Sequence, residues 1–75
     1  MALEVKTVIT IVGAVVATHQ EITEKSSLHE LGIDDFDTLE LIMRLEDQFH
    51  LHIDDEQFKK LQSINQIMSY LNSLV

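Results

Sequence analysis

The sequence predicts an all-α protein, a small four-helix bundle of three main helices and one short helix with a long loop after the first helix. Its 75 residues include no Pro and only two Gly, and a scarcity of chain breakers favours helices. Apolar residues recur at helical spacing along much of the chain. Because hydrophobic residues make up 45% of it, a core is possible, and the length predicts a single domain over residues 1–75.

The first predicted helix covers an apolar segment near the start of the chain. Helical spacing there relates Val5, Val8, Ile9, Val12 and Val16. Because β-branched residues also favour strands, a strand over residues 7–11 is the competing interpretation, but the apolar period continues and no partner strand is evident. The apolar run at 8–17 also resembles the core of a secretory signal. Glu4 cancels Lys6 and the run is too short to span a bilayer, so we expect it to belong to the fold.

A polar loop is predicted over residues 18–27, with Ile22 anchoring it to the core. Residues 27–32 are predicted to form one helical turn that ends at Gly32. The second main helix is then predicted to begin after Asp34, a good N-cap residue, and to end near residue 49 or 50. Asp35 and Asp37 fall in its first turn, where the helix dipole favours negative charge.

Two opposite faces are predicted for this second helix. A rotation of roughly 100° per residue gathers apolar side chains on a core side formed by Leu41, Ile42, Leu45 and Phe49. The same rotation gathers a mixed set on the outer side: Phe36, Glu40, Met43 and Asp47. Leu39 and Glu46 fall on one flank, and Asp37 and Arg44 on the other. Apolar groups among carboxylates suit a docking surface. The alternative is that Phe36 folds back on the preceding loop and Met43 is an ordinary exposed residue.

Two further helices complete the predicted bundle. After a short connection, Asp54 is predicted to cap a helix of about two turns over residues 55–61. Ser63 and Gln66 match the capping box at the start of a last helix. The core face of that helix is predicted to contain Ile64, Ile67, Met68, Leu71 and Leu74.

The charge of the chain limits its partners. Thirteen acidic and five basic side chains give a net charge of −8, which repels nucleic acid and anionic membranes and attracts a partner with a basic patch.

No nucleophile is positioned with a base and no glycine-rich phosphate loop is present, so we expect no catalysis. His50 and His52 match no known metal-ligand spacing, and no metal site is expected.

Three stretches of the sequence resemble one known family. They are LGIDDFDTLEL at residues 31–41, LEDQF at 45–49 and IDDE at 53–56. Their types and spacing resemble the acyl carrier proteins and the related peptidyl and aminoacyl carrier domains. The resemblance is strongest over residues 28–56, includes the segment 67–71 and is weak before residue 17.

The resemblance implies a four-helix carrier fold whose second helix recognises carrier-dependent enzymes of fatty acid, polyketide or related thioester pathways. The expected partners are therefore enzymes with basic docking patches, namely synthases, acyltransferases and phosphopantetheinyl transferases. The matching positions imply a partner surface formed by Asp34, Phe36, Asp37, Glu40, Met43, Glu46 and Asp47. A cytoplasmic monomer is expected. A space for an acyl chain, or a plain packed core, is expected among Leu45, Ile53, Phe58, Leu61, Ile67 and Tyr70.

The sequence departs from the family at Asp35, where the resemblance implies a Ser that carries 4′-phosphopantetheine through a phosphodiester. A carboxylate could form only a mixed anhydride, which water would cleave, so we expect this chain to be unmodified and to carry no cofactor. Thr38 is the nearest hydroxyl but faces another direction. An engineered replacement, a natural loss in a paralogue that acts as an adaptor, and a non-carrier role on the same fold all remain possible explanations of Asp35.

Overall fold

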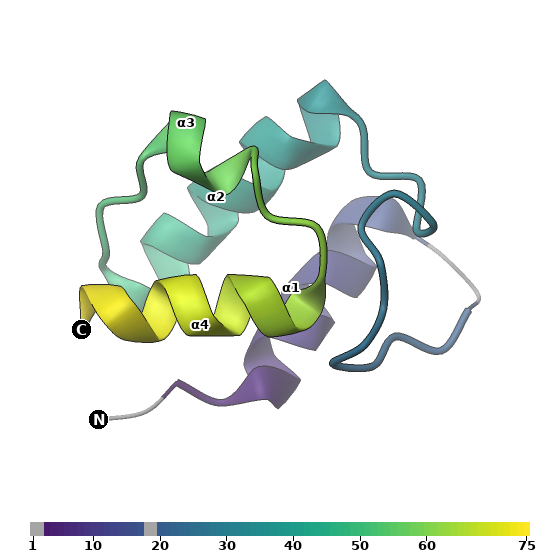
Figure 1. The fold of residues 1–75 in the computed structure, drawn as a ribbon, viewed down its shortest axis with the longest axis horizontal. Coiled ribbons are helices and arrows are strands. Elements are labelled where there is room, and N and C mark those ends of the chain that lie inside the picture. Colours follow the sequence, from purple (N-terminus) through teal and green to yellow (C-terminus); the bar gives the residue numbers. More distant parts are fainter. Residues whose placement is uncertain (1–2, 18–19) are drawn as a thin grey trace.

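The protein folds into a small all-α bundle, described by a computed structural model over residues 3–17 and 20–75 (Figure 1). Within these ranges no strand extends beyond a single bridge between Ser27 and Ser63, and the predicted all-α fold is confirmed. The predicted loop begins at two residues, Thr18 and His19, that lie outside the described residues. The helices of the described residues are α1 (Val5–Val16), α2 (Asp35–Phe49), α3 (Asp55–Phe58) and α4 (Ile64–Leu74).

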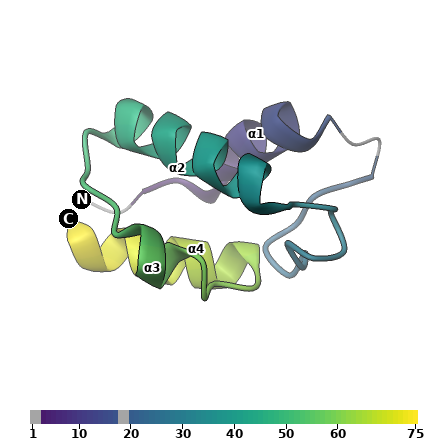
Figure 2. The same cartoon turned by 90° about the horizontal axis from the view of Figure 1, so that it is seen from above.

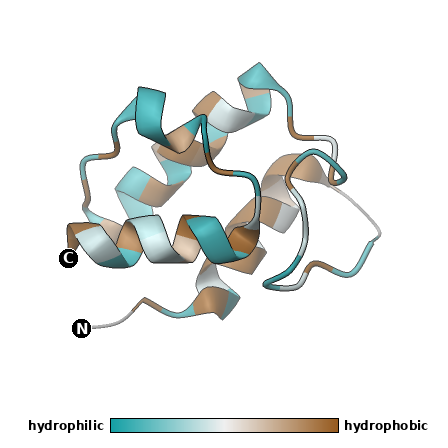
Figure 3. Ribbon diagram, viewed as in Figure 1, coloured by the Kyte–Doolittle hydropathy of each residue, from teal (hydrophilic) through white to brown (hydrophobic). Residues whose placement is uncertain are grey.

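The core lies between two layers, with α1 and α2 on one side and α3 and α4 on the other (Figure 2). All four helices contribute fully buried side chains, and Figure 3 shows hydrophobic residues along most of α1. The strand interpretation of residues 7–11 is therefore wrong, because these residues lie within α1. Among the described residues, no helix is long and apolar enough to cross a membrane. The buried core consists of Val8, Val12, Leu28, Leu41, Ile42, Leu45, Ile53, Phe58, Ile64, Ile67 and Leu71.

The long loop between α1 and α2 packs against α1 near its start and is hydrogen-bonded to the segment before α4 farther along. Ile22 packs against the core, and a Cβ atom placed on Gly13 of α1 would lie 3.6 Å from the Cδ1 atom of Ile22. The predicted anchor is therefore confirmed. Farther along, the backbone N–H of Leu28 donates to the carbonyl of Gln62 at 2.9 Å. This pairing with the start of α4 was not predicted, because it joins segments distant in the sequence.

The turn before α2 has the predicted form. The N–H of Leu31 donates to the carbonyl of Ser27 at 3.1 Å, as in one turn of an α-helix. Gly32 follows with a φ of 81°, a left-handed conformation that glycine adopts at little cost. The turn therefore ends at Gly32, and Ile33 leads the chain into α2.

Helix α3 is shorter than the sequence predicts. It ends at Phe58 rather than residue 61 and so forms only one turn. Its cap is as predicted, because the Asp54 carboxylate accepts hydrogen bonds from the backbone N–H groups of Glu56 and Gln57 at 2.9 and 3.3 Å. Burial of Phe58 draws the chain toward the core, and the residues after it cross toward α4 (Figure 1).

Helix α4 confirms part of what the sequence predicts for it. The Ser63 hydroxyl caps the helix by accepting from the N–H of Gln66 at 3.2 Å. The Gln66 side chain does not complete the predicted box, because its Oε1 accepts from the N–H of Gln62 at 2.7 Å instead. The prediction for Leu74 is wrong, since this residue is 37% exposed. Leu71 is the last fully buried residue, and the final turn lies at the edge of the molecule.

The start of α2 is fixed by a reciprocal pair of carboxylates. Asp34 Oδ1 accepts from the N–H of Asp37 at 2.8 Å, and the N–H of Asp34 donates to Asp37 Oδ2 at 3.4 Å. The predicted N-cap is confirmed. The helix ends as predicted after Phe49, where His50 takes a φ of 57°.

Asp34→Ala should lower the free energy of unfolding by about 0.5–2 kcal/mol, the usual cost of removing an N-cap side chain. Urea denaturation followed by circular dichroism measures this loss. Asp47→Ala is the matched control, because it removes the same charge from the last turn of α2, where an acid opposes the helix dipole. Equal losses in the two variants would contradict the capping role of Asp34.

Candidate functional site

The outer face of α2 exposes apolar side chains among acids. Phe36 is 84% exposed and Met43 is 68% exposed, while Glu40 and Asp47 are also exposed. The alternative in which Phe36 folds back on the preceding loop is therefore wrong. This geometry agrees with the outer side that the helical rotation predicts.

Leu39 extends this apolar surface, although the sequence places it on a flank. It is 44% exposed, and its spacing from Phe36 and Met43 puts all three on one side of the helix. We call these three residues the α2 stripe. Helical rotation alone cannot distinguish a flank that the bundle covers from one that it leaves open, so the exposure of Leu39 does not follow from the sequence.

Several predicted partner-binding acids also stabilise the fold. Asp34 and Asp37 form the capping box described above. Glu40 forms an exposed ion pair with Arg44, whose Nε lies 2.9 Å from its Oε2; such pairs contribute about 0.3–0.5 kcal/mol. Glu46 Oε2 accepts from the backbone N–H of Ile53 at 2.8 Å.

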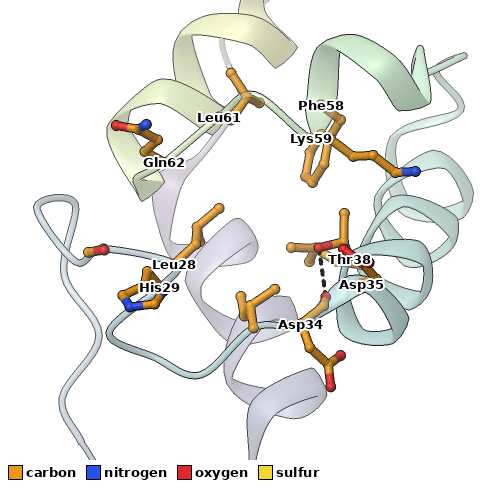
Figure 4. Close-up of a pocket in the computed structure, with 12 residues that line it drawn as sticks. Leu28, His29, Asp34, Asp35, Thr38, Phe58, Lys59, Leu61 and Gln62 are labelled. Carbon is orange, nitrogen blue, oxygen red and sulfur yellow. Dashed lines mark hydrogen bonds between the residues drawn. The ribbon is translucent and has the colours of Figure 1, made fainter.

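The remaining predicted site residue, Asp35, is the exposed first residue of α2 and lines a cleft of about 510 Å³. Figure 4 shows Leu28 on one side of this cleft and Asp35 with Thr38 on the other. Phe58 of α3 forms a further wall. The cleft thus adjoins the start of the exposed face of α2.

Most of the residues expected around an acyl-chain space belong to the hydrophobic core. Leu45, Ile53, Phe58 and Ile67 are fully buried in the core. Leu61 and Tyr70 are partly buried and pack against that core. Of these residues only Phe58 and Leu61 reach the cleft beside Asp35. The arrangement agrees with the packed-core interpretation.

Together, the small helical bundle, the long tied loop and the exposed second helix define the architecture of a carrier protein. Residues 6–71 match the sequence profile of the family described as "Phosphopantetheine attachment site". The chain belongs to this family, and it is a carrier-protein-like domain.

Solved structures of acyl carrier proteins have the same fold. One described as an acyl carrier protein from Mycobacterium tuberculosis is 21% identical, with a TM-score of 0.78 over 92% of both chains. One from Thermotoga maritima is 24% identical, with a TM-score of 0.77 over 93% of this chain and 84% of that chain. The 3-oxo-butyl acyl carrier protein of the actinorhodin polyketide synthase of Streptomyces coelicolor is 12% identical. Its TM-score is 0.76 over 99% of this chain and 92% of that chain.

The start of α2 does not fit the attachment of phosphopantetheine, the group that the family implies. Asp35 presents a carboxylate, which cannot form a stable phosphodiester. The hydroxyl of Thr38, in the same turn, donates to the backbone carbonyl of Asp34 at 2.9 Å. Across the cleft, the Ser27 hydroxyl accepts from the N–H of Glu30 at 3.4 Å. Both hydroxyls thus hold the local backbone.

Proposed function

We propose that this chain is an acyl-carrier-like domain that presents the exposed face of α2 to carrier-dependent enzymes without carrying phosphopantetheine itself. These enzymes would belong to fatty acid, polyketide or related thioester pathways. The observation that carries the proposal is the α2 stripe: an aromatic and two aliphatic side chains exposed beside acids on a helix of a carrier fold. Exposed apolar groups with a charged border are typical of protein docking surfaces.

The chemistry of this face specifies its partner. The whole chain has a net charge of −8. Met43 lies at a hollow that is also lined by Asp47, Glu40 and Arg44, the ion-pair partner of Glu40. A complementary surface would therefore surround an apolar pocket with Lys and Arg. Such complementarity accelerates the encounter and fixes the orientation of the partner. Phe36 would supply a large apolar anchor at the start of the helix.

Asp35 is the observation that favours a second candidate function. If the attachment position is Asp35, the chain cannot become a thioester carrier. The same docking face would then serve a protein-interaction adaptor that occupies the carrier site of a basic partner. Such an adaptor would compete with a modified carrier for this site.

Reversing two charges on the docking face should weaken binding to a basic phosphopantetheinyl transferase. Glu40→Lys combined with Asp47→Lys should raise the dissociation constant at low salt by about tenfold or more, because like charges would face each other across the interface. Isothermal titration calorimetry measures the affinity, and circular dichroism checks that helicity is retained.

Glu4→Lys combined with Glu21→Lys is the matched control for this experiment. Both residues are exposed and lie outside α2, and the change in net charge is the same. We expect this control to weaken binding much less than the α2 variant does. Equal affinities of the two double variants would assign the attraction to overall charge and contradict the α2 docking face.

A further inference from the structure

Helix α3 depends on contacts with other elements, because a helix of one turn is not stable by itself. Two hydrogen bonds to side chains of other helices hold the consecutive backbone N–H groups that precede it. The N–H of Ile53 donates to Glu46 Oε2 of α2 at 2.8 Å, and the N–H of Asp54 donates to the Tyr70 hydroxyl of α4 at 3.0 Å. The start of α3 is therefore held from both layers of the molecule.

Helix α3 also closes one side of the cleft beside Asp35. Phe58, its buried residue, lines that cleft and lies edge-on to Tyr70, with ring centroids 6.4 Å apart and planes inclined at 72°. Figure 4 shows Phe58 and Lys59 on the α3 side of the cleft. Movement of α3 away from α2 would consequently widen the cleft and expose the Phe58 ring.

We propose that Glu46 and Tyr70 form a latch that keeps α3 closed over the cleft in the isolated chain. Glu46 belongs to the same helix as the docking face and is adjacent in sequence to exposed Asp47. The Glu46 carboxylate therefore links α2 to the segment that leads into α3. The latch is a property of the isolated chain and does not rest on the proposed function.

This geometry makes Glu46 a positioning residue rather than a simple contact residue. Its carboxylate is only partly exposed and also lies 3.8 Å from the Nδ1 atom of His52. The oxygen that holds Ile53 is thus within reach of a cation at the surface. Glu40, by contrast, pairs only with Arg44 of its own helix among the described contacts.

Hydrogen exchange in the isolated chain tests the closed latch. Glu46→Ala should lower protection of the Phe58 and Leu61 amides, which donate within and just after α3, by at least about tenfold, because local opening would expose them. The Val12 amide in α1 should keep its protection. Glu46→Gln should largely preserve the protection, because its amide oxygen can still accept from Ile53.

Two further variants make the experiment decisive. Glu40→Ala removes the same charge from the same helix and should leave the Phe58 amide protected. Tyr70→Phe keeps the ring beside Phe58 but removes the hydroxyl, so it tests the latch even if Glu46→Ala does not fold. Equal loss of protection in Glu40→Ala and Glu46→Ala, or unchanged Phe58 protection in Tyr70→Phe, would overturn the proposal.

Fluorescence of the neutral apolar dye N-phenyl-1-naphthylamine tests whether an open α3 exposes the cleft. We expect stronger dye binding by Tyr70→Phe than by the unchanged chain, with Glu40→Ala as the reference. Dye binding that does not follow the loss of Phe58 protection would overturn the link between the latch and the cleft. The exchange and dye measurements need no partner. They therefore test the latch separately from the calorimetric comparison that tests docking.

Discussion

Incubation with coenzyme A and a phosphopantetheinyl transferase of broad specificity should leave the mass of this chain unchanged. Asp35→Ser should instead gain the mass of one phosphopantetheine. The expected difference is all or none, because a Ser hydroxyl can attack the pyrophosphate of coenzyme A and keep the resulting phosphodiester, whereas a carboxylate cannot. Asp35 is exposed on the first turn of α2, so the substituted Ser would be accessible. Intact-mass spectrometry measures the outcome.

Asp34→Ser is the matched control for this gain of function. It makes the same substitution one residue earlier, and Ser is also a good N-cap, so α2 should be retained. We expect no mass gain in this control. A folded Asp35→Ser variant that stays unmodified would mean that the likeness to carrier proteins does not extend to phosphopantetheine attachment at this position. Modification of the unchanged chain would instead place the attachment at another residue and contradict the role of Asp35.

The sequence was sufficient for those parts of the fold that depend on local chemistry. Asp34 caps α2, and Gly32 ends the preceding turn, because each effect arises within a few residues. The core side of α2 also follows from rotation along one helix, and Leu41 and Leu45 are fully buried as predicted. Family resemblance added the second helix as the candidate docking element.

The errors occur where distant segments meet. The length of α3, the exposure of Leu74 and the partner of the Gln66 side chain all depend on how the chain closes over the core. The same is true of Glu46, whose hydrogen bond to Ile53 spans two elements. A helical projection gives the direction of each side chain but not the neighbour that it meets.

Leu45→Ala should cause the largest loss of stability among the changes considered. Leu45 is fully buried in the core, and truncation of a buried Leu costs about 2–5 kcal/mol through lost burial and the cavity left behind. The core of a domain of this size rarely supplies more than about 3–5 kcal/mol. We therefore expect a largely unfolded chain at 25 °C, measured by circular dichroism and by urea denaturation.

Leu39→Ala is the matched control, because it makes the same substitution in the same helix at a partly exposed position. Its effect on stability should be within about 0.5 kcal/mol, as for other surface changes. Because Leu39 belongs to the α2 stripe, the same variant should nevertheless weaken binding to a basic carrier-dependent enzyme. Similar losses of stability in the two variants would mean that α2 buries Leu39 as well as Leu45. A helix oriented in that way would leave no apolar stripe for a partner.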